Sequence, residues 1–340
     1  MTSVTIQNGK FYINGEPTYK GVFWEGHEIE GMLMNSRMIQ AAFDDYNPDT
    51  AGYWAYPDTG KWDPDRNTSE YITAMSEWCE YGLLAVTVGL QGGCPKDKFG
   101  DTQSWHVSAF KPDGALDEAY MGRMKRVCDE ADRLGMVVIL SYFYFGQEYR
   151  WKDEEAIKKA AAAATAWVID NGYKNVIIET VNETDNTPYS LPLLMSGRAI
   201  ELFDVVRSVC AERDFPLCVS ASFVVDIPTP EVMNSADYIL IHGNNGGPEW
   251  VEDMINRVKG SASYRGQPIV NNEDPSYDFE KDNNNMLSCV RNGCSWGLLD
   301  IGKNNYSDGY QRPPVNWGVN TERKKQFFEL VRRITTGDNT

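Results

Sequence analysis

Two glutamates stand directly after short apolar runs, at positions where a buried strand would end. The first, Glu183, follows the run 175–181 with Asn182 in between, and the second, Glu273, follows the run 268–272. Glutamate is usually a solvated surface residue, so these positions are unusual for it. A pair of carboxyl groups can break a glycosidic bond, because one protonates the leaving oxygen while the other attacks the anomeric carbon or activates water. Glu183 and Glu273 are our candidates for such a pair.

Three aspartates near the ends of predicted strands compete for the same roles: Asp274, Asp185 and Asp300. Asp274 is the nearest competitor for the role of Glu273, but Pro275 follows it and indicates a turn. If Glu183 is the acid/base, a negative nucleophile beside it should raise the pKa of Glu183, because like charges disfavour ionisation.

The rest of the sequence offers little for other hydrolytic chemistries. It contains three histidines, His27, His106 and His242, and neither an H-x-x-x-H nor an H-x-H pattern for zinc. The G-x-G-x-x-G fingerprint and the P-loop are also absent. We therefore expect a site without metal or cofactor.

Short apolar runs alternate with amphipathic segments along the chain, a pattern typical of parallel strands covered by helices. The runs predict eight barrel strands at 19–24, 83–90, 136–142, 175–181, 217–222, 238–242, 268–272 and 294–299. Helices are predicted at 67–80, 116–134, 154–171, 197–213 and 322–334, with Asn67 as an N-cap and Gly135 as a stop. We expect an α/β protein, a (β/α)8 TIM barrel in one catalytic domain over residues 1–340.

Two features lie outside a minimal barrel. Residues 1–16 predict an N-terminal β-hairpin that turns at Asn8-Gly9. Segment 28–66 predicts a long loop after strand one, rich in aromatic residues and therefore a candidate for function. An open doubly wound sheet is the alternative fold, but its first strand would normally lead into a glycine-rich turn, whereas here the sequence is Trp24-Glu25-Gly26-His27.

With the strands placed, Asn182-Glu183 closes strand four and Glu273 closes strand seven, and this pattern resembles clan A of the glycoside hydrolases. The stretches NGKFYINGEP and VILSYFYFGQE are similar to uncharacterised cellulase-like members. The resemblance implies a (β/α)8 barrel, retention of anomeric configuration and no cofactor. It also implies Glu183 as acid/base, Glu273 as nucleophile and Asn182 as a partner of the sugar 2-hydroxyl.

Two positions depart from better-known members of the clan. Many of them place an arginine near strand two, where this chain has Gln91-Gly92-Gly93. Many place a tyrosine on strand six beside the nucleophile, where this chain has His242. We expect His242 to bond Glu273 or a sugar hydroxyl, with a structural role as the alternative.

Further residues near the predicted strand ends suit sugar binding. Trp296 is the leading candidate for a stacking platform, because sugar C–H groups pack on an indole face, and its alternative is a place in the barrel core. The other candidates are Trp24, Tyr144, Gln147 and Asn244.

The net charge of −17 opposes binding to nucleic acid and to anionic membranes. The longest apolar runs fall well short of the roughly 20 residues that a transmembrane helix needs. The start, MTSVTIQNGK, lacks an apolar signal segment, and seven cysteines without regular spacing suit a reducing compartment, so we expect a cytoplasmic protein. Oligomeric state is not predicted.

These observations predict a retaining glycoside hydrolase with a carbohydrate substrate, acting on β-linked oligosaccharides or glycosides. A transglycosylase with the same residues and a non-catalytic carbohydrate-binding barrel remain alternatives, as does a metal-dependent barrel hydrolase.

Overall fold

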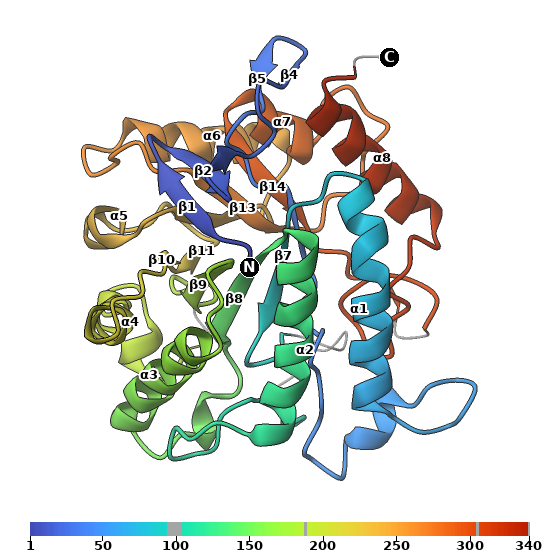
Figure 1. Cartoon of the computed structure of the whole chain (residues 1–340), viewed down its shortest axis with the longest axis vertical. Coiled ribbons are helices and arrows are strands. Elements are labelled where there is room, and N and C mark those ends of the chain that lie inside the picture. Colours follow the sequence, from blue (N-terminus) through green and yellow to red (C-terminus); the bar gives the residue numbers. More distant parts are fainter. Residues whose placement is uncertain (94–103, 187–188, 304–305, 339–340) are drawn as a thin grey trace.

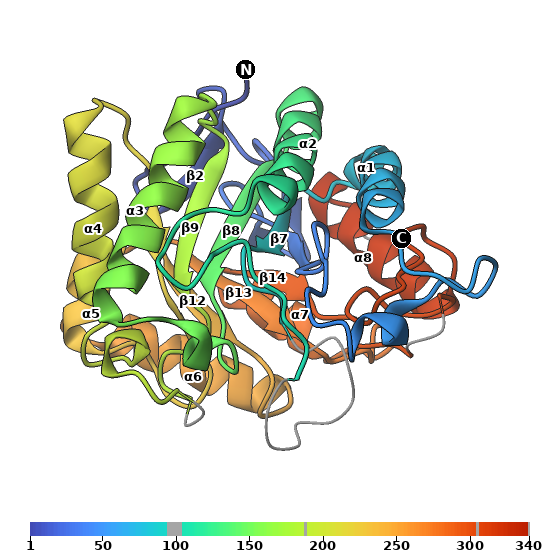
Figure 2. The same ribbon diagram turned by 90° about the horizontal axis from the view of Figure 1, so that it is seen from below.

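A parallel β-sheet closed into a barrel forms the centre of the computed structural model, which describes residues 1–93, 104–186, 189–303 and 306–338. The strands lie inside and the helices outside (Figures 1 and 2). Around the sheet the strands are β6 (Asn35–Arg37), β7 (Ala85–Gly89), β8 (Val137–Phe143), β9 (Val176–Val181), β10 (Val219–Ser220), β11 (Ser222–Phe223), β12 (Ile239–His242), β13 (Ile269–Asp274) and β14 (Cys294–Leu298).

The sheet closes through its fifth strand. That strand is divided at Ala221 into β10, which pairs with β9, and β11, which pairs with β12. The nine segments therefore amount to eight parallel strands, and the prediction of a (β/α)8 barrel is confirmed.

The helices are α1 (Pro64–Glu80), α2 (Glu118–Leu134), α3 (Glu154–Asp170), α4 (Ile200–Glu212), α5 (Pro230–Ser235), α6 (Pro248–Gly260), α7 (Asn285–Arg291) and α8 (Glu322–Thr336), with short 3-10 turns at Ala51–Trp54, Glu148–Arg150 and Pro192–Leu194. Gly135 ends α2 in a left-handed conformation, as predicted. The prediction of Asn67 as an N-cap is wrong, because the side chain of Asp63 caps α1 by accepting from Arg66 N. Asn67 instead lies buried and donates to the backbone of Gln40.

The first barrel strand is not where the sequence pattern placed it. Residues 19–24 lie outside the barrel, and Phe23–Trp24 form β4, which pairs with β5 (His27–Glu28) beside α8 (Figure 1). The true strand is β6, inside the segment that was predicted to be a long loop. Its three residues are Asn, Ser and Arg, so a search for apolar runs could not find it.

The predicted N-terminal hairpin is confirmed. Strands β1 (Val4–Gln7) and β2 (Lys10–Ile13) pair across Asn8 and Gly9, both with positive φ, as a two-residue turn requires. A third strand, β3 (Glu16–Pro17), extends this small sheet. Phe11 is fully buried and meets Tyr238 edge to face at 6.2 Å, so the hairpin covers the end of the barrel where the strands begin.

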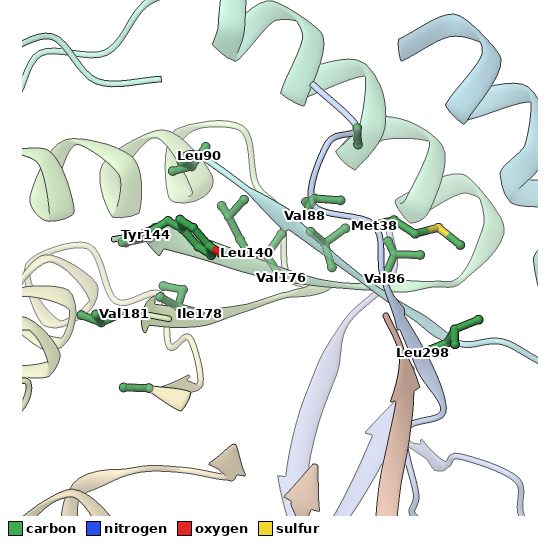
Figure 3. Packing of buried hydrophobic residues seen from close by; sticks show 14 of the residues in the cluster. Met38, Val86, Val88, Leu90, Leu140, Tyr144, Val176, Ile178, Val181 and Leu298 are labelled. Carbon is green, nitrogen blue, oxygen red and sulfur yellow. The ribbon is translucent and has the colours of Figure 1, made fainter. Parts of the chain in front are cut away.

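Side chains on the apolar strands β8 and β13 alternate between two hydrophobic clusters. On β8, Val138 and Leu140 belong to the larger cluster between strands and helices, part of which Figure 3 shows. Val137 and Ile139 belong to the smaller cluster, inside the barrel, which includes Phe11. The inward positions change from apolar at the start of the strands to polar at their ends, where the site lies.

Among the described residues, no helix is long and apolar enough to cross a membrane. The six cysteines within those residues are free, and Cys289, which the sequence predicted to be a core residue, is buried. Cys218, predicted likewise, is partly exposed.

Removing the Phe11 ring should destabilise the barrel. Phe11→Ala leaves a cavity among buried side chains and is expected to lower the free energy of unfolding by about 3–5 kcal/mol in urea denaturation. Thr5→Ala, at an exposed position of β1, is the control and should change stability by less than about 0.5 kcal/mol. Equal effects of the two variants would show that the hairpin does not close the core.

Candidate active site

Five charged side chains meet inside the barrel where the strands end. We call them the ion cluster: Arg37 of β6, Glu179 of β9, Glu183 just after β9, His242 of β12 and Glu273 of β13. All five are buried, with at most 8% of their surface exposed. The cluster occupies the end of the barrel at which TIM-barrel enzymes carry their active sites.

Glu183 and Glu273, predicted from the sequence as a pair, lie side by side. An oxygen of one lies within 4.8 Å of an oxygen of the other. The side-chain amide of Asn244 bridges them, donating from Nδ2 to Glu183 Oε1 at 3.0 Å and to Glu273 Oε1 at 2.9 Å. Retaining glycosidases hold their carboxyl groups about 5 Å apart, whereas inverting enzymes separate them by roughly 6.5–9.5 Å. The spacing therefore suits direct attack by a carboxylate.

Glu183 owes its position to an unusual backbone conformation. Its φ is +49°, in the left-handed region that residues other than glycine rarely adopt. Two hydrogen bonds to neighbouring strands hold this conformation. Glu183 N donates to Ser222 Oγ of β11 at 2.8 Å, and Asn182 N donates to Phe143 O of β8 at 2.9 Å. Backbone strain of this kind is concentrated at functional sites.

Glu273 owes its position to a β-bulge. Ile241 pairs with Asn271 and His242 pairs with Glu273, so β13 carries one residue more than its neighbour. Asn272 donates weakly to Thr87 Oγ1 of the barrel interior at 3.5 Å. Without the extra residue, the alternation of a strand would turn Glu273 outward, and the bulge reverses this.

Arg37 is the central cation of the cluster, and the sequence analysis missed it. Its Nε lies 2.5 Å from Glu273 Oε2, its Nη1 lies 3.3 Å from Glu179 Oε2, and its Nη2 donates to Asn182 Oδ1 at 2.6 Å. Burial alone would lower the pKa of Arg37, but the charges of Glu273 and Glu179 outweigh it and raise that pKa. Arg37 stands in the first barrel strand, whereas the resemblance implied an arginine near strand two.

His242 joins the three carboxylates. Its Nδ1 lies 2.9 Å from Glu183 Oε1 and 3.6 Å from Glu273 Oε2, and its Nε2 lies 3.8 Å from Glu179 Oε1. Burial disfavours the charged ring, but Glu273, Glu179 and Glu183 together raise the pKa of His242 to about 10. The surrounding carboxylates therefore favour the imidazolium form, and the nearest contact of the ring is Glu183 rather than the expected Glu273.

The expected rise in the pKa of Glu183 is wrong for this cluster. Burial does act to raise it, but the hydrogen bond and charge of His242 act in the other direction, and Asn186 adds a hydrogen bond to Glu183 Oε2 at 2.7 Å. The net effect is a pKa below the usual value. The negative neighbour can be inferred from the sequence, whereas the positions of Arg37 and His242 depend on the tertiary structure.

The three competing aspartates are engaged elsewhere. Asp274 accepts hydrogen bonds from Asn285 and from the Trp296 indole, on the outer side of the barrel. Asp185 accepts from three successive backbone N–H groups at residues 224–226. Asp300 pairs with Arg323 at 2.6 Å. Each aspartate therefore anchors local structure.

Of the predicted sugar-binding residues, Asn182, His242 and Asn244 belong to the site, but two tryptophans do not. Trp296 is fully buried and packs against Phe327 of α8, so its alternative place in the core is the one observed. Trp24 lies in the β4–β5 hairpin beside the C-terminal end of α8, at the opposite end of the barrel. Trp24 had been a candidate because the first barrel strand was predicted to end there, and Trp296 because it lies in the eighth strand.

Tyr144 and Gln147 follow β8 at the correct end of the barrel. Tyr144 stacks on Phe145 with ring centroids 4.2 Å apart, and its backbone N donates to Gln91 Oε1. Gln147 is nearly fully buried and donates to Trp105 O at 3.2 Å. Both residues thus help to hold the segment that follows β8 in place.

Glu183, His242 and Glu273 are close enough to share a metal ion, but their chemistry favours ion pairing. Both carboxylates already accept from Asn244, and Glu273 also pairs with Arg37. An imidazolium cannot be a ligand until it loses its proton. Arg37 and His242 supply the positive charge that an ion would bring.

Comparison with known proteins finds likeness in structure but not in sequence. No family model and no curated protein sequence matches the chain. A variant of a glycoside hydrolase family 5 mannosidase from Rhizomucor miehei is 14% identical, with 99% of this chain and 100% of that chain aligned and a TM-score of 0.57. A β-glucosidase from Thermotoga maritima in complex with castanospermine is 9% identical, with coverage of 92% and 100% and a TM-score of 0.59.

A third structure, described as a putative glycoside hydrolase from Bacteroides vulgatus ATCC 8482, is 12% identical with a TM-score of 0.58. The match covers 98% of this chain but 61% of that protein, so this chain spans less than two thirds of its length. At such identities the likeness establishes the barrel fold that these proteins share, and function must be argued from the site.

Removing Arg37 should destabilise the folded protein, because it takes the cation away from buried carboxylates. Arg37→Ala is expected to lower the free energy of unfolding by about 3–5 kcal/mol at pH 7, measured by urea denaturation. Arg126→Ala, which removes an exposed ion pair with Asp65, is the control and should cost no more than about 1 kcal/mol.

The loss of unfolding free energy in Arg37→Ala should also depend on pH, and its direction can be predicted. Burial acts to raise the pKa of Glu179, but Arg37 and His242 lower it to about 2, below the ordinary value of 4.5. A depressed pKa contributes stability that is present above pH 4.5 and lost as pH falls toward 2. The difference between wild type and Arg37→Ala should therefore shrink over that interval, and a difference independent of pH would contradict this account of the cluster.

Proposed function

We propose that the protein is a retaining glycoside hydrolase that cleaves β-linked glycosides or oligosaccharides by double displacement. The observation that carries this proposal is the placement of Glu183 and Glu273, whose oxygens approach within 4.8 Å at the end of the barrel where the strands finish. The spacing matches the requirement for a nucleophile beside an acid/base. The structural neighbours described as glycosidases add support by analogy of fold.

In the first step, Glu273 attacks the anomeric carbon while Glu183 delivers a proton to the glycosidic oxygen. The carbon–oxygen bond breaks, its electron pair goes to the leaving oxygen, and a glycosyl ester forms on Glu273. In the second step, Glu183 takes a proton from water, and the water oxygen attacks the anomeric carbon. The ester bond breaks and Glu273 returns to its carboxylate form.

Arg37 prepares Glu273 for this role. The guanidinium lies 2.5 Å from Glu273 Oε2, and the Asn244 amide holds Oε1, so both oxygens have fixed positions before substrate arrives. Holding a reacting group in place lowers the barrier, because orientation has already been achieved in the free enzyme.

Asn182 is our candidate for binding the sugar. Arg37 occupies its Oδ1 at 2.6 Å, which orients the amide and directs Nδ2 away from the guanidinium. That nitrogen has no hydrogen-bond partner within the described part of the chain. Asn182 Nδ2 would donate to the 2-hydroxyl of the sugar in the reacting position, a contact that strengthens in the transition state. Tyr144 would contribute apolar surface to the same subsite.

A transglycosylase would use the same residues and differ in excluding water from the second step, so product analysis with an added acceptor sugar separates it. A non-catalytic binding barrel is disfavoured by the ion cluster. Burying three carboxylates is costly, and a protein that merely binds neutral sugar has no need of them.

Chemical rescue of two variants tests the two-glutamate assignment. With a panel of aryl glycosides, Glu273→Ala should be inactive, and azide should restore turnover with a glycosyl azide of inverted configuration, because azide attacks in place of the carboxylate. Glu183→Ala should lose about 10²–10⁴-fold in rate on substrates whose leaving group needs protonation. Azide should rescue it with a product of retained configuration.

Glu212→Ala, at the exposed end of α4, is the control and should match the wild type. If the wild type cleaves the panel and both active-site variants match it, the assignment is wrong. Loss of activity on chelation would instead support a metal-dependent mechanism.

A further inference from the structure

A third carboxylate lies directly behind the proposed pair, and the two-glutamate mechanism does not use it. Glu179 is on β9, four residues before Glu183, and both side chains reach His242 in the barrel interior. It has no exposed surface. Its Oε2 pairs with Arg37 at 3.3 Å, while its Oε1 has no hydrogen-bond partner among the residues described and faces His242 Nε2 at 3.8 Å.

His242 thus lies between Glu179 on one ring nitrogen and Glu183 on the other. The charged groups that face it are Glu179 from β9, Glu183 just after β9 and Glu273 from β13. Arg37 of β6 pairs with two of these carboxylates, Glu179 and Glu273. An imidazolium carries N–H donors on both nitrogens and can serve carboxylates on both sides, whereas a neutral ring has only one donor.

This arrangement bears on how Glu183 obtains its proton. A buried Glu183 beside an imidazolium rests as a carboxylate, yet the first step of the proposed reaction needs a carboxylic acid at this position. Nδ1 of His242 lies 2.9 Å from Glu183 Oε1, within direct reach for proton transfer. The proton that Glu183 lacks is therefore held one hydrogen bond away.

We propose that His242 stores the catalytic proton for Glu183, and that Glu179 is the positioning residue that keeps His242 charged. The proposal rests on the glycosidase function proposed above. In the first step, the Nδ1–H bond breaks and its electron pair stays on nitrogen, while Glu183 passes a proton to the leaving oxygen. In the second step, Glu183 takes a proton from water and returns it to Nδ1.

The arrangement keeps the charge of the buried cluster constant. Before reaction, three carboxylates face Arg37 and the imidazolium, which leaves one net negative charge. In the glycosyl-enzyme, Glu273 is a neutral ester, His242 is neutral, and Glu179 and Glu183 face Arg37, which again leaves one negative charge. Proton uptake from solvent would change that charge in a buried site, at a cost in solvation free energy.

The first test measures the protonation of His242 directly by ¹⁵N NMR of histidine side chains. The chain has three histidines, so His27→Asn and His106→Asn assign the spectrum. His242 should appear as an imidazolium at pH 7. In Glu179→Gln, which removes one charge and keeps the shape, its titration should move to lower pH by at least about one unit.

Glu212→Gln, the same change at an exposed site of α4, should leave the titration unaltered. Glu179→Asp, which withdraws the carboxylate by one methylene, provides a second variant should Glu179→Gln not fold, and should shift the titration in the same direction. A neutral His242 at pH 7 in the wild type, or a titration unmoved by these variants, overturns the proposal.

The second test is kinetic. Glu179→Gln should lower kcat by about 10-fold or more on aryl glycosides with poor leaving groups and far less on those with good ones, with KM little changed, because only poor leaving groups need the proton. The alkaline limb of kcat/KM should move to lower pH. A merely structural role would lower stability and leave the limb and the leaving-group dependence as in wild type.

The two tests separate the two proposals. If the wild type cleaves no glycoside, the proposed function and the proton transfer to a leaving group both fail. The NMR titration still decides, without substrate, whether Glu179 holds the charge on His242.

Discussion

The site depends on one electrostatic constraint, which is that three carboxylates are buried together inside the barrel. Glu179, Glu183 and Glu273 would repel one another strongly in a medium of low polarity. Arg37 reaches two of them and His242 lies near all three, so each carboxylate has a cation within 4 Å. Because these five side chains come from four different strands, the charges are balanced only when the barrel is closed.

The backbone conformation determines which acidic side chains point into the charged cluster. A bulge in β13 places Glu273 in the barrel interior and its neighbour Asp274 on the outside, where Asp274 accepts from the Trp296 indole. The left-handed conformation of Glu183 has a similar effect at the end of β9. The bulge therefore separates the proposed nucleophile from a structural carboxylate a single residue away, while at the end of β9 the structural Asp185 lies two residues beyond Glu183.

The fold and the specificity of the protein are carried by different parts of the chain. Barrels only 9–14% identical in sequence superpose on this one over more than nine tenths of its length. What they share is the layering of strands and helices, which many sequences satisfy. The residues that would meet a sugar beyond the glutamates, such as Tyr144, follow the strands, where loops differ most between relatives.

Sequence alone determined the barrel, the hairpin and the two glutamates, because apolar runs and an Asn-Gly turn are local signals that need no knowledge of distant residues. It could not reveal β6 or Arg37. That strand is polar, and its burial is favourable only because Glu179 and Glu273, far away in the chain, neutralise its arginine. For the same reason the direction of the pKa shift of Glu183 was misjudged: the sign depends on which cations lie within a few ångströms, and only tertiary structure brings Arg37 and His242 to that distance.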